Sequence, residues 1–352
     1  MGFFGGNTNS LPQPDQNSAG VPPAQISTNE QARPVPLFYG TRRMGVTFLS
    51  QAFDQHADEV KDHSGGKFGS DRVTGYNYYS SFAALVAHGP VDFIREIWFD
   101  NQKVWSSDPP LARDDDNPIS APIQINGYGS WTFYWGTEGQ TIDDPPDHKH
   151  GLASLATGVV VSPNVAEDHP GYVGLCYFVA RDQFLGFQRT NIQNIEVVVG
   201  RFPKTFFGVP APRPSVVTAE YNSWLPDGTE RIDHSYTDGS PAGADANPVA
   251  ILVDMLVNTR YGLSLRDVSD TDTALDRAAL SALATRFKTT ESFGLSPFID
   301  RQQAFSETLT QLLEHVDGWL VADAAGRLTM GLARQQETDE LPEISPDALT
   351  AL

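Results

Sequence analysis

Residues 76–90 read Tyr-Asn-Tyr-Tyr-Ser-Ser-Phe-Ala-Ala-Leu-Val-Ala-His-Gly-Pro. Aromatic and β-branched residues favour strands and Gly-Pro is a turn signal, so this stretch predicts a long extended segment that ends beside the Gly-Pro pair. Residues 91–100 mix apolar and charged positions and predict a second strand, with a tight turn over 100–103. Residues 131–136 are rich in strand formers and predict a third. We therefore expect a β-sheet at the centre of this half of the chain.

Further strands are predicted on both sides of this centre. Residues 34–49 alternate apolar with small or polar residues around two glycines, which predicts two short strands. Residues 172–181 and 192–199 predict two more. At least six strands joined by long loops, with few helical periods, predict an antiparallel β-barrel or sandwich over residues 34–202.

The second half of the chain has a different sequence pattern, with a proline-rich stretch followed by predicted helices. Prolines recur within residues 203–214 and predict a stiff connector, because each proline fixes φ and removes a hydrogen-bond donor. Residues 215–334 predict a smaller mixed α+β domain, so the fold class is α+β and rich in β-structure. Three helices are expected in it, over 247–258 (N-cap Asn247, Pro248 in the first turn, Gly262 as the stop), 276–287 and 305–316 (N-cap Ser306). Residues 318–331 predict a strand, a turn and a strand.

Length and charge limit the functions that the chain is expected to have. With about 150 residues per domain, 352 residues predict two domains. Lys and Arg number 24 against 44 Asp and Glu, and the formal charge of −20 disfavours binding to nucleic acids and anionic membranes. The sequence contains no long apolar run and no signal-peptide pattern, which favours a cytosol-like compartment. Residues 1–33 predict a flexible arm and 335–352 an acidic linker.

Two loops contain residues of the kind that bind metals. Residues 106–122 include Asp114–Asn117, which lack the alternating ligands and closing Glu of a calcium loop. Residues 137–170 include His148 and His150, which lack the i, i+4 spacing of a helical zinc site. We interpret both loops as solvated surface. The neighbouring acidic residues of the second loop are Asp143, Asp144 and Asp147.

Other candidates also have a structural interpretation. Cys176 is the only cysteine, which excludes an intramolecular disulfide, and its apolar neighbours predict a buried side chain. The sequence lacks a nucleophile elbow, a phosphate-binding loop and a dinucleotide fingerprint. No catalytic, cofactor-binding or metal-binding residue is therefore predicted. Acidic residues interpreted as the approach to a helix are Asp267, Asp270 and Asp272.

Aromatic residues concentrate in two of the predicted strands. Such rings can stack on sugars or bases, but strand propensity explains them as core and sheet-face residues. We expect the second role for most of them. The residues concerned are Tyr76, Tyr78, Tyr79, Trp131, Phe133, Tyr134 and Trp135.

Several blocks of the sequence together resemble one protein family. The blocks occupy 76–91, 94–105, 133–140 with 170–175, 247–263, and the hairpin 318–331. They are similar to the tail-tip or baseplate hub proteins of long-tailed phages, a family that includes lambda-like tail-tip proteins and gene-transfer-agent hubs. The blocks follow the family's order over roughly residues 35–335, which is more specific than any one block. The matching positions are Tyr76, Tyr78, Phe82, Gly89, Pro90, Trp98, Asp100, Gly136, Gln140, Asn247, Pro248 and Gly262.

The sequence departs from the family pattern at three places. Asn101-Gln102 stands where the family has an Asp-Gly turn, and the loop over 141–169 is long. Residues 187–191 stand where a Gly-Arg-Ile-Pro-like turn is expected. These departures concern loop geometry.

The resemblance implies a structural virion protein without enzymatic activity or cofactor. A family hub is a homotrimer whose β-barrel-like domains form a pseudo-sixfold ring in the tail tip or baseplate. It joins the tail tube and distal tail protein to the tip, seats the end of the tape-measure protein, closes the tube and opens it for DNA delivery. Other tail-tip and fibre proteins are implied partners, contact with the host envelope is indirect, and synthesis takes place in the bacterial cytoplasm.

The resemblance also suggests an interpretation of the negative charge and of the chain length. A negative hub suits a conduit through which DNA passes without specific binding. Family hubs often continue into further modules, so 352 residues lead us to expect either a shortened hub or modules carried by another polypeptide.

Two other functions remain open from the sequence. A cell-wall hydrolase carried on the tail would depend on a residue such as Asp144 or His150. A carbohydrate-binding receptor module would use the aromatic residues of the strands.

Overall fold

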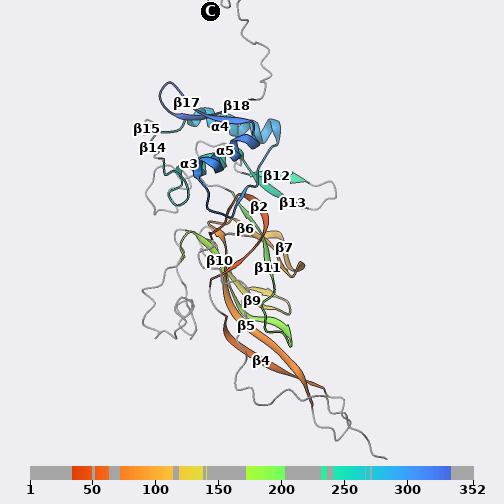
Figure 1. Cartoon of the computed structure of the whole chain (residues 1–352). Coiled ribbons are helices and arrows are strands. Elements are labelled where there is room, and N and C mark those ends of the chain that lie inside the picture. The colour runs from red at the N-terminus through yellow and green to blue at the C-terminus, as the bar shows by residue number, and fades with distance from the viewer. Residues whose placement is uncertain are drawn as a thin grey trace, which may run out of the picture. The chain divides into compact units, whose positions relative to one another are not determined.

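The computed structural model describes two compact parts of the chain (Figure 1). Unit 1 takes in residues up to 36 together with 42–199, and unit 2 takes in Leu37–Thr41 together with the residues from Gly200 onward. The predicted arm (1–33), connector (203–214) and acidic linker (335–352) lie outside the described residues. Those described are 34–49, 52–62, 72–113, 119–137, 140, 172–202, 231–235, 241–265, 267–269 and 272–333.

The long aromatic stretch forms the central strand of a six-stranded antiparallel sheet in unit 1. The strand β5 (Arg72–His88) is 17 residues long and pairs with β10 (Leu175–Phe187) from Leu175 opposite His88 to Phe187 opposite Asn77. Side chains of β5 are fully buried from Phe82 to Ala84. The sheet order is β3 (Thr47–Phe48), β5, β10, β9 (Gly129–Tyr134) and β8 (Ile123–Ile125), with β4 (Phe53–Asp62) paired to the first part of β5.

A second sheet of unit 1 contains four strands. Its order is β2 (Gly40–Gly45), β11 (Ile195–Arg201), β6 (Phe93–Phe99) and β7 (Gln102–Ala112). Within the described residues both sheets are open, because neither pairs its first strand with its last. The antiparallel β-rich prediction is confirmed, but of its two alternatives the barrel is wrong: β4 extends along the outer part of β5 and does not pair with β8.

Stacked aromatic rings form the core of unit 1. The rings of Trp131 and Phe178 stack with centroids 4.1 Å apart and an interplanar angle of 8°. Phe82 meets both rings edge-on, and Phe99 of β6 lies 5.6 Å from Trp131. Aromatic side chains bury large apolar areas, so this stack contributes to the hydrophobic stabilisation between the strands.

Unit 2 is a mixed α+β fold in which the predicted helices are confirmed. The helices are α3 (Pro248–Val257), α4 (Arg277–Arg286), followed by the π-helical turn η2 (Phe287–Glu291), and α5 (Phe305–His315). Short strand pairs accompany them: β1 (Leu37–Phe38) with β16 (Phe298–Ile299), β12 (Arg231–Ser235) with β13 (Pro241–Ala246), β14 (Asp267–Ser269) with β15 (Asp272–Thr273), and β17 (Gly318–Ala322) with β18 (Leu328–Leu332).

Helix boundaries correct three details of the sequence reading. The cap of α5 is Ala304 without a side-chain hydrogen bond, so Ser306 lies inside the helix. The last residue of α3 is Val257 and its C-cap is Asn258, so the helix stops before Gly262. Asp267 and Asp272 precede α4 as expected, but they lie in the β14–β15 hairpin and not at the start of the helix, whose N-cap is Asp276.

None of the helices among the described residues is long and apolar enough to cross a membrane.

Candidate functional site

Three family-motif residues that are far apart in the sequence meet at one end of the large sheet. Gly89 follows β5, whereas Gly136 and Gln140 follow β9. The backbone N–H of Gly136 donates to Oε1 of Gln140 at 2.7 Å, and Nε2 of Gln140 donates to the carbonyls of Tyr172 and Leu175, each at 3.2 Å. Gln140 is buried, so these bonds satisfy its amide.

The two glycines of this junction leave no room for a side chain. A Cβ atom added to Gly89 would lie 2.5 Å from the Cα of Gly136, and one added to Gly136 would lie 2.7 Å from the Cα of Gly89. Gly136 also has a φ of 83°, a conformation that favours glycine. Pro90 follows directly, after a cis peptide bond. The motif glycines are thus required by the close approach of two strand ends.

A second motif group lies at the turn between β6 and β7. Asp100 and Asn101 both have positive φ, 45° and 66°, which matches a tight two-residue hairpin turn. Asp100 Oδ1 accepts the N–H of Asn194 at 3.0 Å. The Trp98 ring lies under the guanidinium of Arg43, 4.0 Å from its centroid. Asp100 thus joins the hairpin to the residue that precedes β11, and Trp98 contacts Arg43 of β2.

The remaining motif residues have structural positions. Phe82 is in the core, while Tyr76 and Tyr78 are half-buried on the outer part of β5. Asn247 is the N-cap of α3, with Pro248 in the first turn as predicted. A Cβ on Gly262 would lie 2.4 Å from the carbonyl oxygen of Met255, so this glycine permits a close backbone contact.

Unit 2 contains a buried polar cluster that the sequence did not indicate. Oδ2 of Asp254 accepts hydrogen bonds from the hydroxyls of Tyr39 (2.9 Å) and Tyr261 (2.8 Å). It also accepts from Nη2 of Arg201 at 3.3 Å, and the two charged side chains are each 3% exposed. Nη1 of Arg201 donates to the carbonyl of Phe38 at 3.0 Å. Breaking a buried pair of this kind costs about 3–5 kcal/mol.

Burial and charge alter the proton affinities in this cluster. Burial, followed by the Asp254 carboxylate, raises the pKa of Tyr39 well above its ordinary value. Burial raises the pKa of Tyr261 in the same direction, although the guanidinium of Arg201 opposes it. Both hydroxyls therefore keep their protons and remain donors to Asp254. The hydrogen bonds join four side chains of unit 2, which indicates a structural role, although Nε of Arg201 is buried without a hydrogen-bond partner among the described residues.

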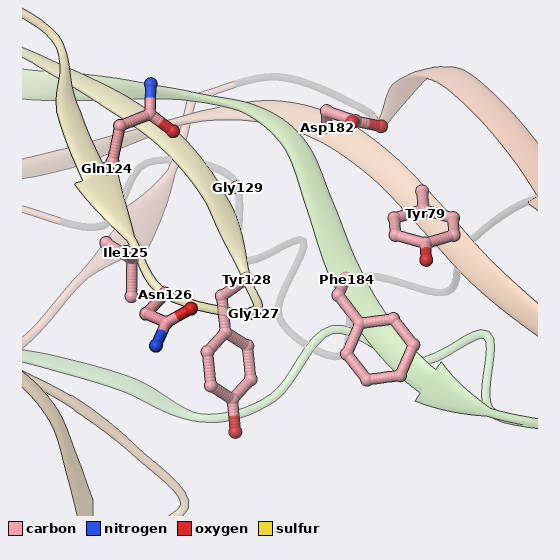
Figure 2. A pocket seen from close by; sticks show the side chains of 9 residues that line it. All are labelled: Tyr79, Gln124, Ile125, Asn126, Gly127, Tyr128, Gly129, Asp182 and Phe184. Carbon is pink, nitrogen blue, oxygen red and sulfur yellow. The ribbon is translucent and has the colours of Figure 1, made fainter.

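The open pocket of unit 1 lies beside the turn between β8 and β9 (Figure 2). Its volume is about 430 Å³. The rings of Tyr79, Tyr128 and Phe184 line it together with polar side chains. The complete lining is Tyr79, Gln124, Ile125, Asn126, Gly127, Tyr128, Gly129, Asp182 and Phe184.

The backbone positions the lining residues of this pocket. The N–H of Tyr128 donates to the carbonyl of Ile125 at 2.8 Å, and the N–H of Phe184 donates to the carbonyl of Tyr128 at 2.9 Å. A register shift in β10 between Ala180 and Gln183 marks a bulge, where Asp182 has a φ of 53°. Such a bulge re-aims side chains, and here it leaves Asp182 exposed while the next residue is buried.

Sequence reasoning named only Tyr79 among the pocket residues. Asn126-Gly127 between two short apolar runs is a hairpin signal that would have located the turn. The bulge at Asp182 has no comparable signal in the sequence. Burial raises the pKa of Tyr79, and the carboxylates of Asp58 and Asp182 act in the same direction.

Most of the predicted aromatic residues belong to the core, as expected. Trp131, Phe133 and Trp135 are almost completely buried, and Tyr134 is 6% exposed and stacks on Tyr177. They cannot serve as a solvent-facing sugar platform.

The remaining candidates from the sequence are Cys176 and the residues considered as metal ligands. Cys176 is buried as predicted, and burial raises the pKa of its thiol. The described residues contain no group of three or more His, Cys, Asp or Glu side chains that could hold a metal ion. Asp114–Asn117 and Asp270 lie outside the described residues, as do Asp143, Asp144, Asp147, His148 and His150.

Comparisons with known proteins give a weak structural likeness. No protein-family model matches the chain, and a search of the curated proteins finds no match. Among solved structures, the chain is similar to a chain in the virion of a native gene transfer agent particle, with 16% sequence identity and a TM-score of 0.39. The likeness covers 89% of this chain and 56% of that chain, so this chain spans little more than half of its neighbour's length.

Proposed function

We propose that the chain is a structural virion protein, the hub of a phage-type tail tip or baseplate. One observation carries the proposal: sequence blocks in the order typical of this family contain the residues that close the strand ends of unit 1. Gly89 and Gly136 approach within a distance that only glycine permits, and Gln140 bonds the same junction. These glycines are required by a particular backbone contact, whereas strand-forming residues occur in any β-sheet. A match at the glycines therefore supports a shared fold more strongly.

The sheets provide a means of assembly for such a hub. Within the described residues, the edge strands of the larger sheet are β3 and β4 beside β5 and β8 at the other end, and those of the smaller sheet are β2 and β7. Edge strands carry backbone groups that can pair with a neighbouring subunit. In the proposed homotrimer such contacts are heterologous and close into a ring. The distal tail protein and the tape-measure protein are the proposed neighbours along the tail axis.

The charge of the chain is consistent with a DNA conduit. A formal charge of −20 per chain repels the phosphate backbone, so that DNA would pass without binding to the wall. The buried cluster of unit 2 and the aromatic core of unit 1 are structural features, and we propose no catalytic step.

The proposal is tested by locating the chain in the particles that contain it. A gold-labelled antibody raised against the full chain is applied to purified particles, with pre-immune antibody as the control. The hub proposal predicts label at the end of the tail. Label on the capsid, or absence of the chain from washed particles, would contradict it.

A further inference from the structure

We propose that the pocket beside the β8–β9 turn binds a neutral saccharide. The proposal rests on the geometry of unit 1 and holds or fails independently of the hub function. The residues that line this pocket differ from the aromatic residues considered in the sequence analysis. Tyr79, which is half-buried, is the one residue that belongs to both sets.

A rigid group of aromatic rings forms one part of the pocket (Figure 2). The ring of Phe184 lies 5.4 Å from Tyr79 and 6.4 Å from Tyr128, measured between centroids. Phe99 meets the Tyr128 ring edge-on at 4.8 Å, and His56 stacks on Tyr79 at 4.8 Å with an angle of 7°. The rings are therefore held in place before a ligand arrives, which lowers the entropy cost of binding.

Planar polar side chains form the other part. Gln124 and Asn126 are exposed, and neither side-chain amide has a hydrogen bond with another described residue. The Asp182 carboxylate is 68% exposed, and its ion-pair partner among the described residues is Nε2 of His56 at 3.4 Å. An amide offers both donors and an acceptor, and a carboxylate offers two acceptors, so these groups match the paired hydroxyls of a sugar ring.

The combination of aromatic rings and hydrogen-bonding side chains in one open pocket is suited to a sugar ring. The C–H face of a pyranose is apolar and can pack on an aromatic ring, while its hydroxyls require hydrogen-bonding partners. A volume of about 430 Å³ falls within the usual range of small-molecule sites and suits a mono- or disaccharide.

Charge restricts the class to neutral sugars. None of the nine residues that line the pocket is Lys or Arg, and the only charged one is Asp182. With the chain at −20, a uronic or sialic acid would be repelled. The same repulsion excludes nucleotides, whose bases would otherwise fit an aromatic site.

The test is calorimetric titration of the full chain with a defined panel of sugars. The neutral probes are the methyl glycosides of glucose, galactose, mannose and N-acetylglucosamine and their β1,4-linked disaccharides; the anionic probes are glucuronic acid and sialyllactose. We expect saturable binding of at least one neutral probe with a dissociation constant of about 1 mM, because small ligands gain little energy per atom in open sites. No saturable binding by the folded chain would overturn the proposal, as would a preference for the anionic probes.

Variants locate the binding in the pocket. Tyr128→Ala removes a ring and is expected to weaken binding about tenfold. Gln124→Ala and Asn126→Ala change exposed side chains, so they test the polar contacts in a chain that keeps its fold, as verified by circular dichroism. The matched control is Trp319→Ala, which removes an aromatic ring that is 48% exposed in unit 2. Equal weakening by the control, or no effect of the three pocket variants, would show that the pocket is not the site.

Discussion

Gly89 and Gly136 approach each other so closely that neither position has room for a side chain. Each glycine faces the backbone of the other, so a methyl group at either position has to displace a strand end. Gly127 offers a useful contrast, since its φ of 78° is almost the same as the 83° of Gly136 but a Cβ there would meet nothing within 4 Å.

Substitution by alanine separates crowding from backbone strain at these two glycines. Gly127→Ala introduces strain alone and is expected to lower the free energy of unfolding by about 1–2 kcal/mol. Gly136→Ala adds a backbone collision, and the expected loss is about 2–5 kcal/mol. Urea denaturation with an unchanged slope measures both values. Equal losses would show that the junction is less tightly packed than described.

The buried tyrosines of unit 2 predict a loss of stability at alkaline pH. Tyr39 and Tyr261 have raised pKa values in the folded chain, whereas in the unfolded chain they ionise near about pH 10. The unfolded state therefore loses these protons first as the pH rises. Their stabilising effect is complete below about pH 10 and declines above it.

A double variant isolates this effect. In the chain with Tyr39→Phe and Tyr261→Phe, the free energy of unfolding should fall less steeply between about pH 9 and about pH 11 than in the unaltered chain. Comparing slopes cancels the contribution of other groups that titrate in this range. Tyr76→Phe, outside the cluster, is the control. Identical slopes for the double variant and the unaltered chain would contradict the assigned cause.

Among single residues, those with a local signal could be predicted from the sequence. The Asn247 cap and the turn at Asp100 depend on neighbours in the chain, and both are found in the structure. The contact between Gly89 and Gly136 and the cluster around Asp254 join distant segments, so no local pattern could indicate them.

At the scale of elements, the helix start at Asn247 joins two helices of unit 2. Its Oδ1 accepts the N–H of Val249 at 3.0 Å, and its Nδ2 donates to the carbonyl of Ala284 in α4 at 2.9 Å. Asp276 caps α4 through the N–H of Ala279 at 3.1 Å and makes no bond to another described helix, although its Oδ2 lies 3.9 Å from Nη2 of Arg327.

Replacing Asn247 should therefore destabilise both helices, whereas replacing Asp276 should destabilise α4 alone. Asn247→Ala removes the cap of α3 and the bond to α4, with an expected cost of about 2–3 kcal/mol. Asn247→Ser keeps a capping oxygen and should cost about 1 kcal/mol less. Asp276→Ala should cost about 1 kcal/mol. Hydrogen exchange should show faster opening of both helices for Asn247→Ala and of α4 alone for Asp276→Ala; the same pattern in both variants would contradict the cross-link.

Element prediction failed where polar residues form strands. The strand β4 reads Phe-Asp-Gln-His-Ala-Asp-Glu-Val-Lys-Asp, which lacks the apolar alternation of a half-buried strand. Residues 106–112 were expected in a loop because of Pro109 and Pro110, yet they belong to β7. Since β7 is at the edge of its sheet, its prolines need not donate to a neighbour.

At the scale of the whole molecule, the α+β class could be predicted from the sequence, but the closure of the sheet could not. Strand content follows from local propensity, whereas closure depends on which edges pair. The β5–β10 pairing joins segments about a hundred residues apart and has no local signal. The open edges that result are the feature through which the proposed ring would assemble.

The most direct test of the hub proposal is an electron cryomicroscopy reconstruction of the tail end of particles that contain the chain. The account predicts density for both units of the chain in a ring of three copies around the tail axis, next to the sixfold tail tube. A ring of six identical copies, or density for the chain only in the capsid, would contradict it.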